Sequence, residues 1–294
     1  MNLFAGLSVA LATPFTPDFA VDLPAFRRLV RHVVDGGVDN LVVLGSTGEA
    51  ATILEAERDA LISACLEEAG TCPVVVGTGS NATAQTAAWT RRAQELGAQG
   101  ALVVTPYYNK PTPAGLVAHY QAVTQAAPGL PVLIYNVPGR TGLNLLPSTL
   151  ALLWENPQLV AVKESSGNLA QISEIARTLP KGKTLLSGDD GLALASIAVG
   201  ASGLVSVLGN VLPRQTKQMV DLALAGKRGA AIALHQELLP LMDALFLESN
   251  PIPTKAALAL KGICGDTLRL PLVAASAATR ARLAELLATR VEVA

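Results

Sequence analysis

Residues 159–169 read LVAVKESSGNL, an apolar run with the composition of a strand that ends in Lys163 and passes directly into polar loop residues. A lysine inside such a strand would be buried at a cost, whereas a lysine at its C-terminal end can point into a pocket at the strand's mouth. There the amine is partly dehydrated, which favours the neutral form that attacks ketones and makes Schiff bases. The competing interpretation is that Lys163 simply turns into solvent, as most lysines do.

The lysine-bearing run is one of several similar runs that recur along the chain with helical patterns between them. They are nearly continuous in apolar residues rather than alternating, which is typical of parallel strands covered on both faces. The predicted strands are residues 7–11, 41–44, 74–76, 101–104, 132–135, 160–163, 184–187 and 203–207. The predicted crossover helices include residues 23–35, 55–69, 82–96, 114–126 and 169–178.

Eight strand-and-helix units predict an α/β protein with a (β/α)8 barrel at residues 1–225, whose active site would lie where the strands end. An open, doubly wound sheet is the alternative. Such a sheet usually has a glycine-rich phosphate loop after its first strand, and this chain has ATPFTP at residues 12–17 instead. From residue 226 the alternation stops, and helical patterns at 230–246, 255–261 and 272–287 predict a C-terminal helical domain over residues 226–294.

The composition narrows the range of functions. The chain has 294 residues, of which 50% are hydrophobic, and a net charge of −1, so it can bury a large core but offers no basic field for nucleic acid. No apolar stretch reaches the roughly 18 residues of a membrane-spanning helix, and we expect a cytoplasmic protein without a membrane partner. The three cysteines and three histidines lack metal-ligand spacing, and no cofactor fingerprint is found, so we expect neither a metal nor a cofactor.

Polar residues stand where the predicted strands end. Taken singly, each group has an ordinary explanation: glycine-rich turns are common, strand-end tyrosines are often core residues, and paired aspartates often cap helices. Their convergence on one barrel mouth is a stronger indication of a site. The groups are GSTGE at 45–49, TPYYN at 105–109, YNVPGRTG at 135–142 and SGDD at 187–190.

Imine formation at Lys163 needs three kinds of helper, and the chain contains all of them. A tyrosine hydroxyl linked to a second hydroxyl can relay protons. Ser46, Thr47 and the amides of their glycine-bearing loop can hold a substrate carboxylate. The guanidinium of Arg140 suits a second, acidic substrate. We therefore predict a Schiff-base enzyme.

The ordered motifs resemble the lysine-dependent pyruvate aldolase family, which includes the N-acetylneuraminate lyases, over essentially the whole chain. That family is built as a (β/α)8 barrel with a C-terminal helical domain. The resemblance is strongest to the branch that condenses pyruvate with L-aspartate-4-semialdehyde on the route to diaminopimelate and lysine. The motifs are ATPF at 12–15, GSTGEAAT at 45–52, VGTGSNAT at 76–83, TPYYNKP at 105–111, YNVPGRTG at 135–142, VKESSGN at 162–168, SGDD at 187–190, SNPIPTKAAL at 249–258 and LRLPL at 268–272.

The resemblance implies specific catalytic roles. Lys163 would form the imine with pyruvate, and the resulting enamine would attack the aldehyde. Tyr135 would transfer protons and be linked through Ser46 to Tyr108, which this family lends across a tight-dimer interface to the neighbouring subunit. The enzyme would be a lyase that assembles as a homotetramer, a dimer of dimers.

The resemblance also implies the substrate-binding residues. Thr47 and the loop amides would hold the pyruvate carboxylate, and Arg140 would bind the carboxylate of the semialdehyde. Gly188 and the backbone carbonyl of Val205 would lie beside the substrate. The stretch SNPIPTK at residues 249–255 is very family-like, but its residues give it no role beyond packing.

Two positions depart from the family pattern. Ser46 stands where the synthases commonly have threonine, so the hydroxyl is kept but the methyl group that restricts its rotamer is lost. Lysine-inhibited members tend to carry histidine or glutamate at the positions of Glu55, Arg58 and Gln85. Here an arginine replaces a histidine and a glutamine replaces a glutamate, so we expect weak or absent feedback by lysine.

Two other functions compete with the condensation. A lyase or aldolase acting on N-acetylneuraminate or a 2-keto-3-deoxy sugar acid would use the same Schiff base, but those branches typically lack an arginine at the position of Arg140. A non-catalytic binding barrel is the more remote alternative. The complete set Lys163, Tyr135, Tyr108 and Ser46 argues against it.

Overall fold

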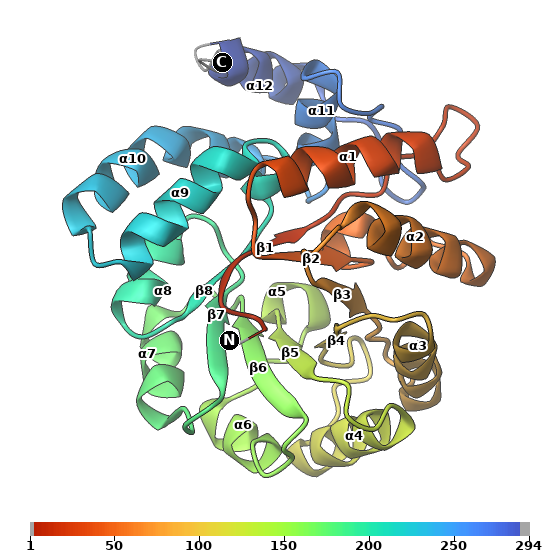
Figure 1. Cartoon of the computed structure of the whole chain (residues 1–294), viewed down its shortest axis with the longest axis vertical. Helices are drawn as coiled ribbons and strands as arrows, with labels where there is room; N and C mark the ends of the chain where they lie inside the picture. The colour runs from red at the N-terminus through yellow and green to blue at the C-terminus, as the bar shows by residue number, and fades with distance from the viewer. Residues whose placement is uncertain (1–2, 289–294) are drawn as a thin grey trace.

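The computed structural model describes residues 3–288, in which eight parallel strands close into one barrel in sequence order, with β8 paired to β1 (Figure 1). The (β/α)8 prediction is confirmed, and the open-sheet alternative is wrong. The strands are β1 Gly6–Ala10, β2 Asn40–Val43, β3 Val74–Gly77, β4 Gly100–Val104, β5 Val132–Asn136, β6 Leu159–Glu164, β7 Thr184–Ser187 and β8 Gly203–Ser206.

A ring of helices surrounds the strands (Figure 1). The five predicted crossover helices are found to within a residue or so at each end. The helices up to the end of the ring are α1 Leu23–Asp35, α2 Glu55–Glu68, α3 Thr83–Glu95, α4 Pro113–Ala126, α5 Pro138–Thr141, α6 Pro147–Leu153, α7 Leu169–Thr178, α8 Ala193–Ala198 and α9 Pro213–Leu224, with short 3-10 turns at Ser46–Gly48 (η1) and Leu208–Asn210 (η2).

The strands consist mostly of apolar residues because both of their faces are buried. One set of side chains fills the barrel interior, where Phe4, Val42, Leu133 and Leu186 belong to a single cluster. The other set packs outward against the helices. This two-sided burial explains why the sequence runs are continuous rather than alternating.

Side-chain caps determine where helices begin next to the barrel mouth. The Asn168 side chain accepts hydrogen bonds from the backbone N–H groups of Ala170 and Gln171, so α7 starts immediately after the loop that follows β6. Thr112 caps α4 in the same way, by accepting from the Gly115 N–H at 3.3 Å. These caps keep the strand-to-helix loops short and hold their polar residues near the strand ends.

Beyond the ring lie α10 Arg228–Ala244, α11 Ile252–Leu260 and α12 Ala277–Ala288, with α11 and α12 beside each other outside the barrel (Figure 1). The prediction of a helix from residue 272 is wrong at its start. Ser276 accepts a hydrogen bond from the Thr279 N–H at 3.2 Å and so caps a helix that begins at Ala277. The division at residues 225 and 226 stays a prediction.

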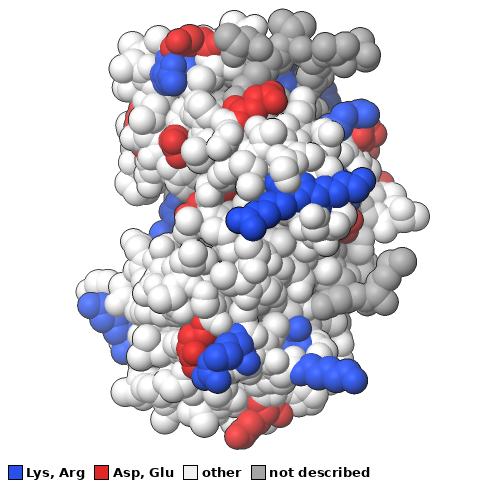
Figure 2. Space-filling view, turned by 90° about the vertical axis from the view of Figure 1, so that its left-hand side faces the viewer, with Lys and Arg blue, Asp and Glu red and all other residues white. Residues whose placement is uncertain are grey.

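Charged side chains on the described surface are mixed in sign. On the face drawn in Figure 2, Lys and Arg are interspersed with Asp and Glu among uncharged residues. Among the helices of residues 3–288, none combines the length and the apolar character needed to span a lipid bilayer.

Candidate active site

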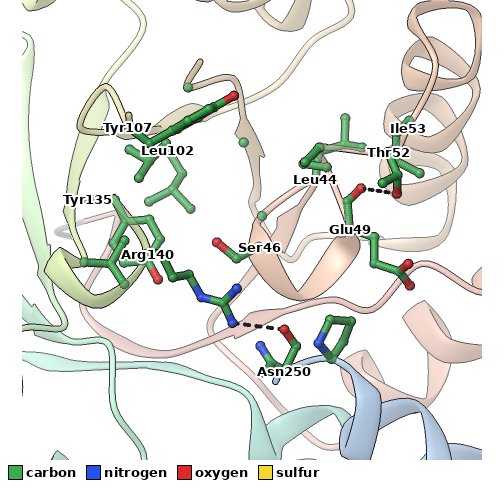
Figure 3. A pocket seen from close by; sticks show the side chains of 18 of the residues that line it. Leu44, Ser46, Glu49, Thr52, Ile53, Leu102, Tyr107, Tyr135, Arg140 and Asn250 are labelled. Carbon is green, nitrogen blue, oxygen red and sulfur yellow. Dashed lines mark hydrogen bonds between the residues drawn. The ribbon is translucent and has the colours of Figure 1, made fainter. Parts of the chain in front are cut away.

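Most of the predicted site residues surround a cavity at the C-terminal ends of the strands, which we call the inner cavity. Its volume is about 150 Å³. It adjoins a larger outer cavity of about 370 Å³, with which it shares part of its lining. Both cavities are walled by residues from several strands and from the chain beyond α10, as Figure 3 shows for the outer cavity. The predicted site residues in the wall of the inner cavity are Ser46, Thr47, Tyr135, Arg140, Lys163 and Gly188.

Lys163 lies near the C-terminal end of the lysine-bearing strand, β6, directly beside Tyr135 in β5. Its side chain is only 5% exposed, and its Nζ lies 4.2 Å from the centre of the Tyr135 ring. The interpretation that Lys163 turns into solvent is therefore wrong. A buried lysine amine can form an imine with a ketone, and a neighbouring phenol can transfer protons in that reaction.

The residues that follow Tyr135 and Lys163 lock the ends of their strands together. Asn136 pairs with Glu164 in the strand register, and its Nδ2 donates to Glu164 Oε2 at 2.9 Å. Glu164 Oε1 accepts the N–H of Ser166 at 2.7 Å. Because side chains alternate between the two faces of a strand, this outward pair fixes the positions of the two inward residues.

Gly188 leaves room for the lysine side chain. A Cβ at this position would lie 1.9 Å from Ser165 Oγ and 2.6 Å from Lys163 Cε. Any larger residue would therefore displace the lysine. The role of Gly188 is to let the Lys163 stem run across the end of β7.

Ser46 and Thr47 are held by a 3-10 turn directly after β2. Glu49 closes the turn in the left-handed conformation, with φ of 54°, and donates its N–H to Ser46 O at 3.2 Å. Ser46 lies in the wall of both cavities. The Thr47 hydroxyl is buried and accepts a hydrogen bond from Asn250 Nδ2 at 2.9 Å.

Arg140 reaches the cavities from α5, the short helix that follows β5. Its Nη2 donates to the backbone carbonyl of Asn250 at 2.9 Å (Figure 3). A guanidinium has five N–H donors in a fixed fork, so this contact orients the group and leaves donors for a ligand. In Figure 3, Ser46, Tyr135 and Arg140 face the same space.

The family-like stretch at residues 249–255 contributes to the site, a role that its sequence did not predict. Asn250 lines both cavities and contacts two predicted substrate-binding residues. Lys255 is fully buried, and its Nζ lies 2.7 Å from Glu49 Oε1 and 2.8 Å from the Thr13 carbonyl. Burial lowers the pKa of Lys255, while the Glu49 carboxylate opposes that shift. The pair fastens α11 beneath the turn that carries Thr47.

Tyr108 and Val205 do not line either cavity. Tyr108 is 88% exposed, and its backbone is in the left-handed conformation, with φ of 71°. That it serves a neighbouring subunit stays a prediction. Its neighbour Tyr107 lines the outer cavity. The Val205 side chain belongs to the apolar interior of the barrel, and Val207 reaches the inner cavity instead.

The position of Asp190 in SGDD suggested that its side chain caps the following helix, but it does not. Its buried carboxylate accepts the Ser206 hydroxyl and the N–H groups of Val207 and Leu208. Burial raises the pKa of this carboxyl, and those donors oppose the shift. Asp190 therefore holds the loop after β8 against the end of β7.

Arg58 forms part of the wall of the outer cavity. It is 4% exposed, donates from Nη2 to the Gly77 carbonyl at 2.7 Å, and lies 3.9 Å above the Trp89 ring. Burial lowers the pKa of Arg58 to about 10. Even so, the group is a cation near neutral pH.

The histidines and cysteines among residues 3–288 form no cluster of three or more potential metal ligands with each other or with acidic residues. His119 is buried, and its Nδ1 is hydrogen-bonded to the Thr83 hydroxyl at 2.9 Å. Burial lowers its pKa to about 4. Cys65 is a fully buried core residue.

The chain is thus a (β/α)8 barrel with a cavity around a buried lysine at the mouth of the barrel. Comparison with known proteins identifies its family. Residues 3–290 match the model of the Dihydrodipicolinate synthetase family, and the chain belongs to that family. A curated relative, the 4-hydroxy-tetrahydrodipicolinate synthase of Cyanothece sp. (strain PCC 7425 / ATCC 29141), is 45% identical over 288 residues, which cover 98% of each chain.

Solved structures agree with this assignment. The dihydrodipicolinate synthase from Thermotoga maritima is 40% identical with a TM-score of 0.95, and 98% of each chain is covered. The enzyme from Cyanidioschyzon merolae, solved with lysine bound, is 38% identical with a TM-score of 0.95, again with 98% of each chain covered. The resemblance indicated by the sequence motifs is confirmed.

Proposed function

We propose that the inner cavity condenses pyruvate with L-aspartate-4-semialdehyde through a Schiff base on Lys163, which makes the chain a 4-hydroxy-tetrahydrodipicolinate synthase. The observation that carries this proposal is the buried Lys163 with its Nζ 4.2 Å from the centre of the Tyr135 ring. Family membership and the names of the relatives support the same reaction.

The chemistry begins with attack of the Lys163 amine on the keto carbon of pyruvate. The carbinolamine loses its hydroxyl as water, and the imine forms. Loss of a proton from the methyl group then gives an enamine, whose terminal carbon forms a new bond to the aldehyde carbon of the semialdehyde. The aldehyde oxygen takes up a proton and becomes a hydroxyl, and the Lys163 imine is regenerated. The amino group of the semialdehyde then attacks the imine carbon, the ring closes, and the Lys163 amine leaves as the free base.

Proton transfer in these steps falls to Tyr135 and Ser46. Both hydroxyls belong to residues in the wall of the inner cavity, which Lys163 also lines. A phenol and an alcohol in contact can pass a proton to and from the carbinolamine oxygen without a strong acid. Tyr108 would complete the relay from a second subunit in the predicted homotetramer. That assembly and a cytoplasmic location stay predictions.

The two carboxylates are bound by separate groups. The pyruvate carboxylate would be held by the Thr47 hydroxyl and by the N–H groups of its 3-10 turn, which are oriented donors. The semialdehyde carboxylate would pair with Arg140 in the fork geometry that guanidinium groups favour. Separate sites let pyruvate bind and form the imine before the second substrate arrives.

Steady-state kinetics with the semialdehyde test the assignment. Arg140→Ala should raise the semialdehyde KM at least about tenfold, the size expected for loss of a hydrogen bond to a charged group, and leave pyruvate binding nearly unchanged. Arg91→Ala is a matched control, because Arg91 also donates to a backbone carbonyl, that of Ala126, far from the cavity. An unchanged semialdehyde KM in Arg140→Ala, or cleavage of N-acetylneuraminate in place of condensation, would contradict the proposal.

A further inference from the structure

Asn250 occupies a position between the two carboxylate-binding groups of the site. Its side chain is 5% exposed, and it lies in the wall shared by the inner and outer cavities. The residue comes just before α11, which the buried Lys255–Glu49 pair fastens to the barrel. Asn250 is therefore held rigidly from the C-terminal side of the chain.

The hydrogen bonds around the Asn250 amide have a defined direction. The Thr254 hydroxyl donates to Asn250 Oδ1 at 3.0 Å, so this oxygen faces α11. The amide nitrogen therefore faces the opposite side, where Nδ2 donates to Thr47 Oγ1 at 2.9 Å. An amide nitrogen can only donate, so Thr47 can only accept in this contact.

The direction of that bond decides what Thr47 offers to a ligand. A threonine hydroxyl has one proton and two lone pairs. Because Asn250 occupies a lone pair, the proton cannot be donated to Asn250 and remains available to an acceptor in the inner cavity, whose wall includes Thr47. A hydroxyl whose proton is available binds an anion; a hydroxyl that donated to Asn250 would present lone pairs and repel one.

The main chain of Asn250 holds the guanidinium of Arg140. The Asn250 carbonyl accepts from Arg140 Nη2 at 2.9 Å, which restrains the guanidinium while its other N–H groups stay available. One residue thus orients the hydroxyl assigned to pyruvate and the guanidinium assigned to the semialdehyde.

We propose that Asn250 is a positioning residue for the α-keto carboxylate: its amide donates to Thr47 and thereby commits the threonine proton to the carboxylate of pyruvate. This inference rests on the proposed function. It predicts that pyruvate binding depends on the hydrogen-bond direction at position 250 and not merely on the size of the side chain.

The first test reverses that direction with an isosteric change. The ionised carboxylate of Asn250→Asp can only accept, so the Thr47 proton turns toward it and is lost to the substrate. The matched control is Asn156→Asp, since Asn156 Nδ2 donates in the same way to Thr124 Oγ1, at 2.8 Å, in the loop before β6. The readout is the pyruvate concentration that gives half of the maximal Lys163 adduct after cyanoborohydride reduction, measured by intact mass.

At about pH 8 we expect this concentration to rise at least about tenfold in Asn250→Asp and to stay unchanged in Asn156→Asp. The rise should shrink as the pH falls through the pKa of the introduced carboxyl, ordinarily about 3.9, because the protonated group can donate again. An adduct with unchanged half-saturation in Asn250→Asp would overturn the inference alone. Failure of the wild-type protein to form any adduct would overturn the proposed function and this inference with it.

A double-mutant cycle separates positioning from simple charge repulsion, because its variants carry no new charge. Thr47→Val removes the hydroxyl, and Asn250→Ala removes the donor that orients it. If Asn250 acts through Thr47, the double variant should have the same half-saturating pyruvate concentration as Thr47→Val alone. If the two effects multiply, Asn250 does not act through Thr47 and the inference is wrong.

Discussion

Replacing Lys255 by methionine should destabilise the protein severely. The Lys255 and Glu49 side chains are 0% and 1% exposed, and their charged atoms lie 2.7 Å apart. Methionine keeps most of the buried stem but removes the cation, so Glu49 Oε1 and the Thr13 carbonyl lose their donor. The backbone N–H of Arg269 still donates to Glu49 Oε2 at 3.2 Å.

The expected loss follows from that uncompensated carboxylate. Removing one partner of a buried ion pair costs about 3–5 kcal/mol, a large part of the roughly 5–15 kcal/mol by which proteins are stable. Replacing both partners, as Lys255→Met with Glu49→Gln, should cost less, because no buried charge is left alone. Urea unfolding followed by circular dichroism measures the free energy of unfolding of the single and the double variant.

The control is an ion pair at the surface. Arg177 pairs with Glu174, their side chains are 70% and 44% exposed, and Arg177→Met should leave the free energy of unfolding nearly unchanged. If Lys255→Met also costs less than about 1 kcal/mol, or if the double replacement costs more than the single one, the account of the buried pair is wrong.

Three further results are expected. Gly188→Ala should abolish or strongly reduce the pyruvate adduct at Lys163 on reduction, because the added Cβ would lie 2.6 Å from Lys163 Cε; a normal adduct yield would contradict this. Lysine should bind weakly or not at all in calorimetry, because the cationic Arg58 lines the outer cavity, and half-inhibition of activity by micromolar lysine would refute that. The Arg269 guanidinium lowers the pKa of Glu57 below its usual 4.5, so the stability that the pair contributes is present above about pH 4.5 and lost as the pH falls through the lowered value. The difference in melting temperature between wild type and Glu57→Gln should therefore close on acidification, and a difference that persists to about pH 2 would contradict the sign.

Much of the fold can be predicted because its signals are local. Apolar runs and helical periodicity are properties of short windows, so strands such as β6 and helices such as α7 can be predicted close to their bounds. The site follows from topology, since parallel strands in a closed barrel bring their C-terminal ends to one mouth. Lys163, Tyr135 and Ser46 can therefore be grouped from the order of the strands alone.

The contributions of Asn250 and Lys255 could not be predicted in this way. Their partners Thr47 and Glu49 lie 203 and 206 positions away in the chain, and no local pattern encodes such pairs. A lysine at the end of SNPIPTK has the pattern of a surface residue until the packing of α11 against the barrel is known. The SNPIPTK motif was the only signal in the sequence for these two residues, and their role depends on tertiary contacts that a motif does not specify.

The exposure of Tyr108 shows a different limit. Its place after β4 put it among the polar groups at the barrel mouth, and the resemblance implied that it serves a neighbouring subunit. In this chain its backbone is left-handed and its side chain is exposed. Whether an outward side chain completes a site depends on the surface of another copy of the chain, which neither periodicity nor strand order specifies.

The proposed reaction depends on an imine at Lys163, which reductive trapping with pyruvate detects. The protein is treated with borohydride in the presence and absence of pyruvate, its intact mass is measured, and the modified peptide is mapped, with Lys163→Ala alongside. We expect one pyruvate-sized adduct confined to Lys163 and none in the variant. An unmodified wild-type protein, or an adduct on another lysine such as Lys255, would contradict it.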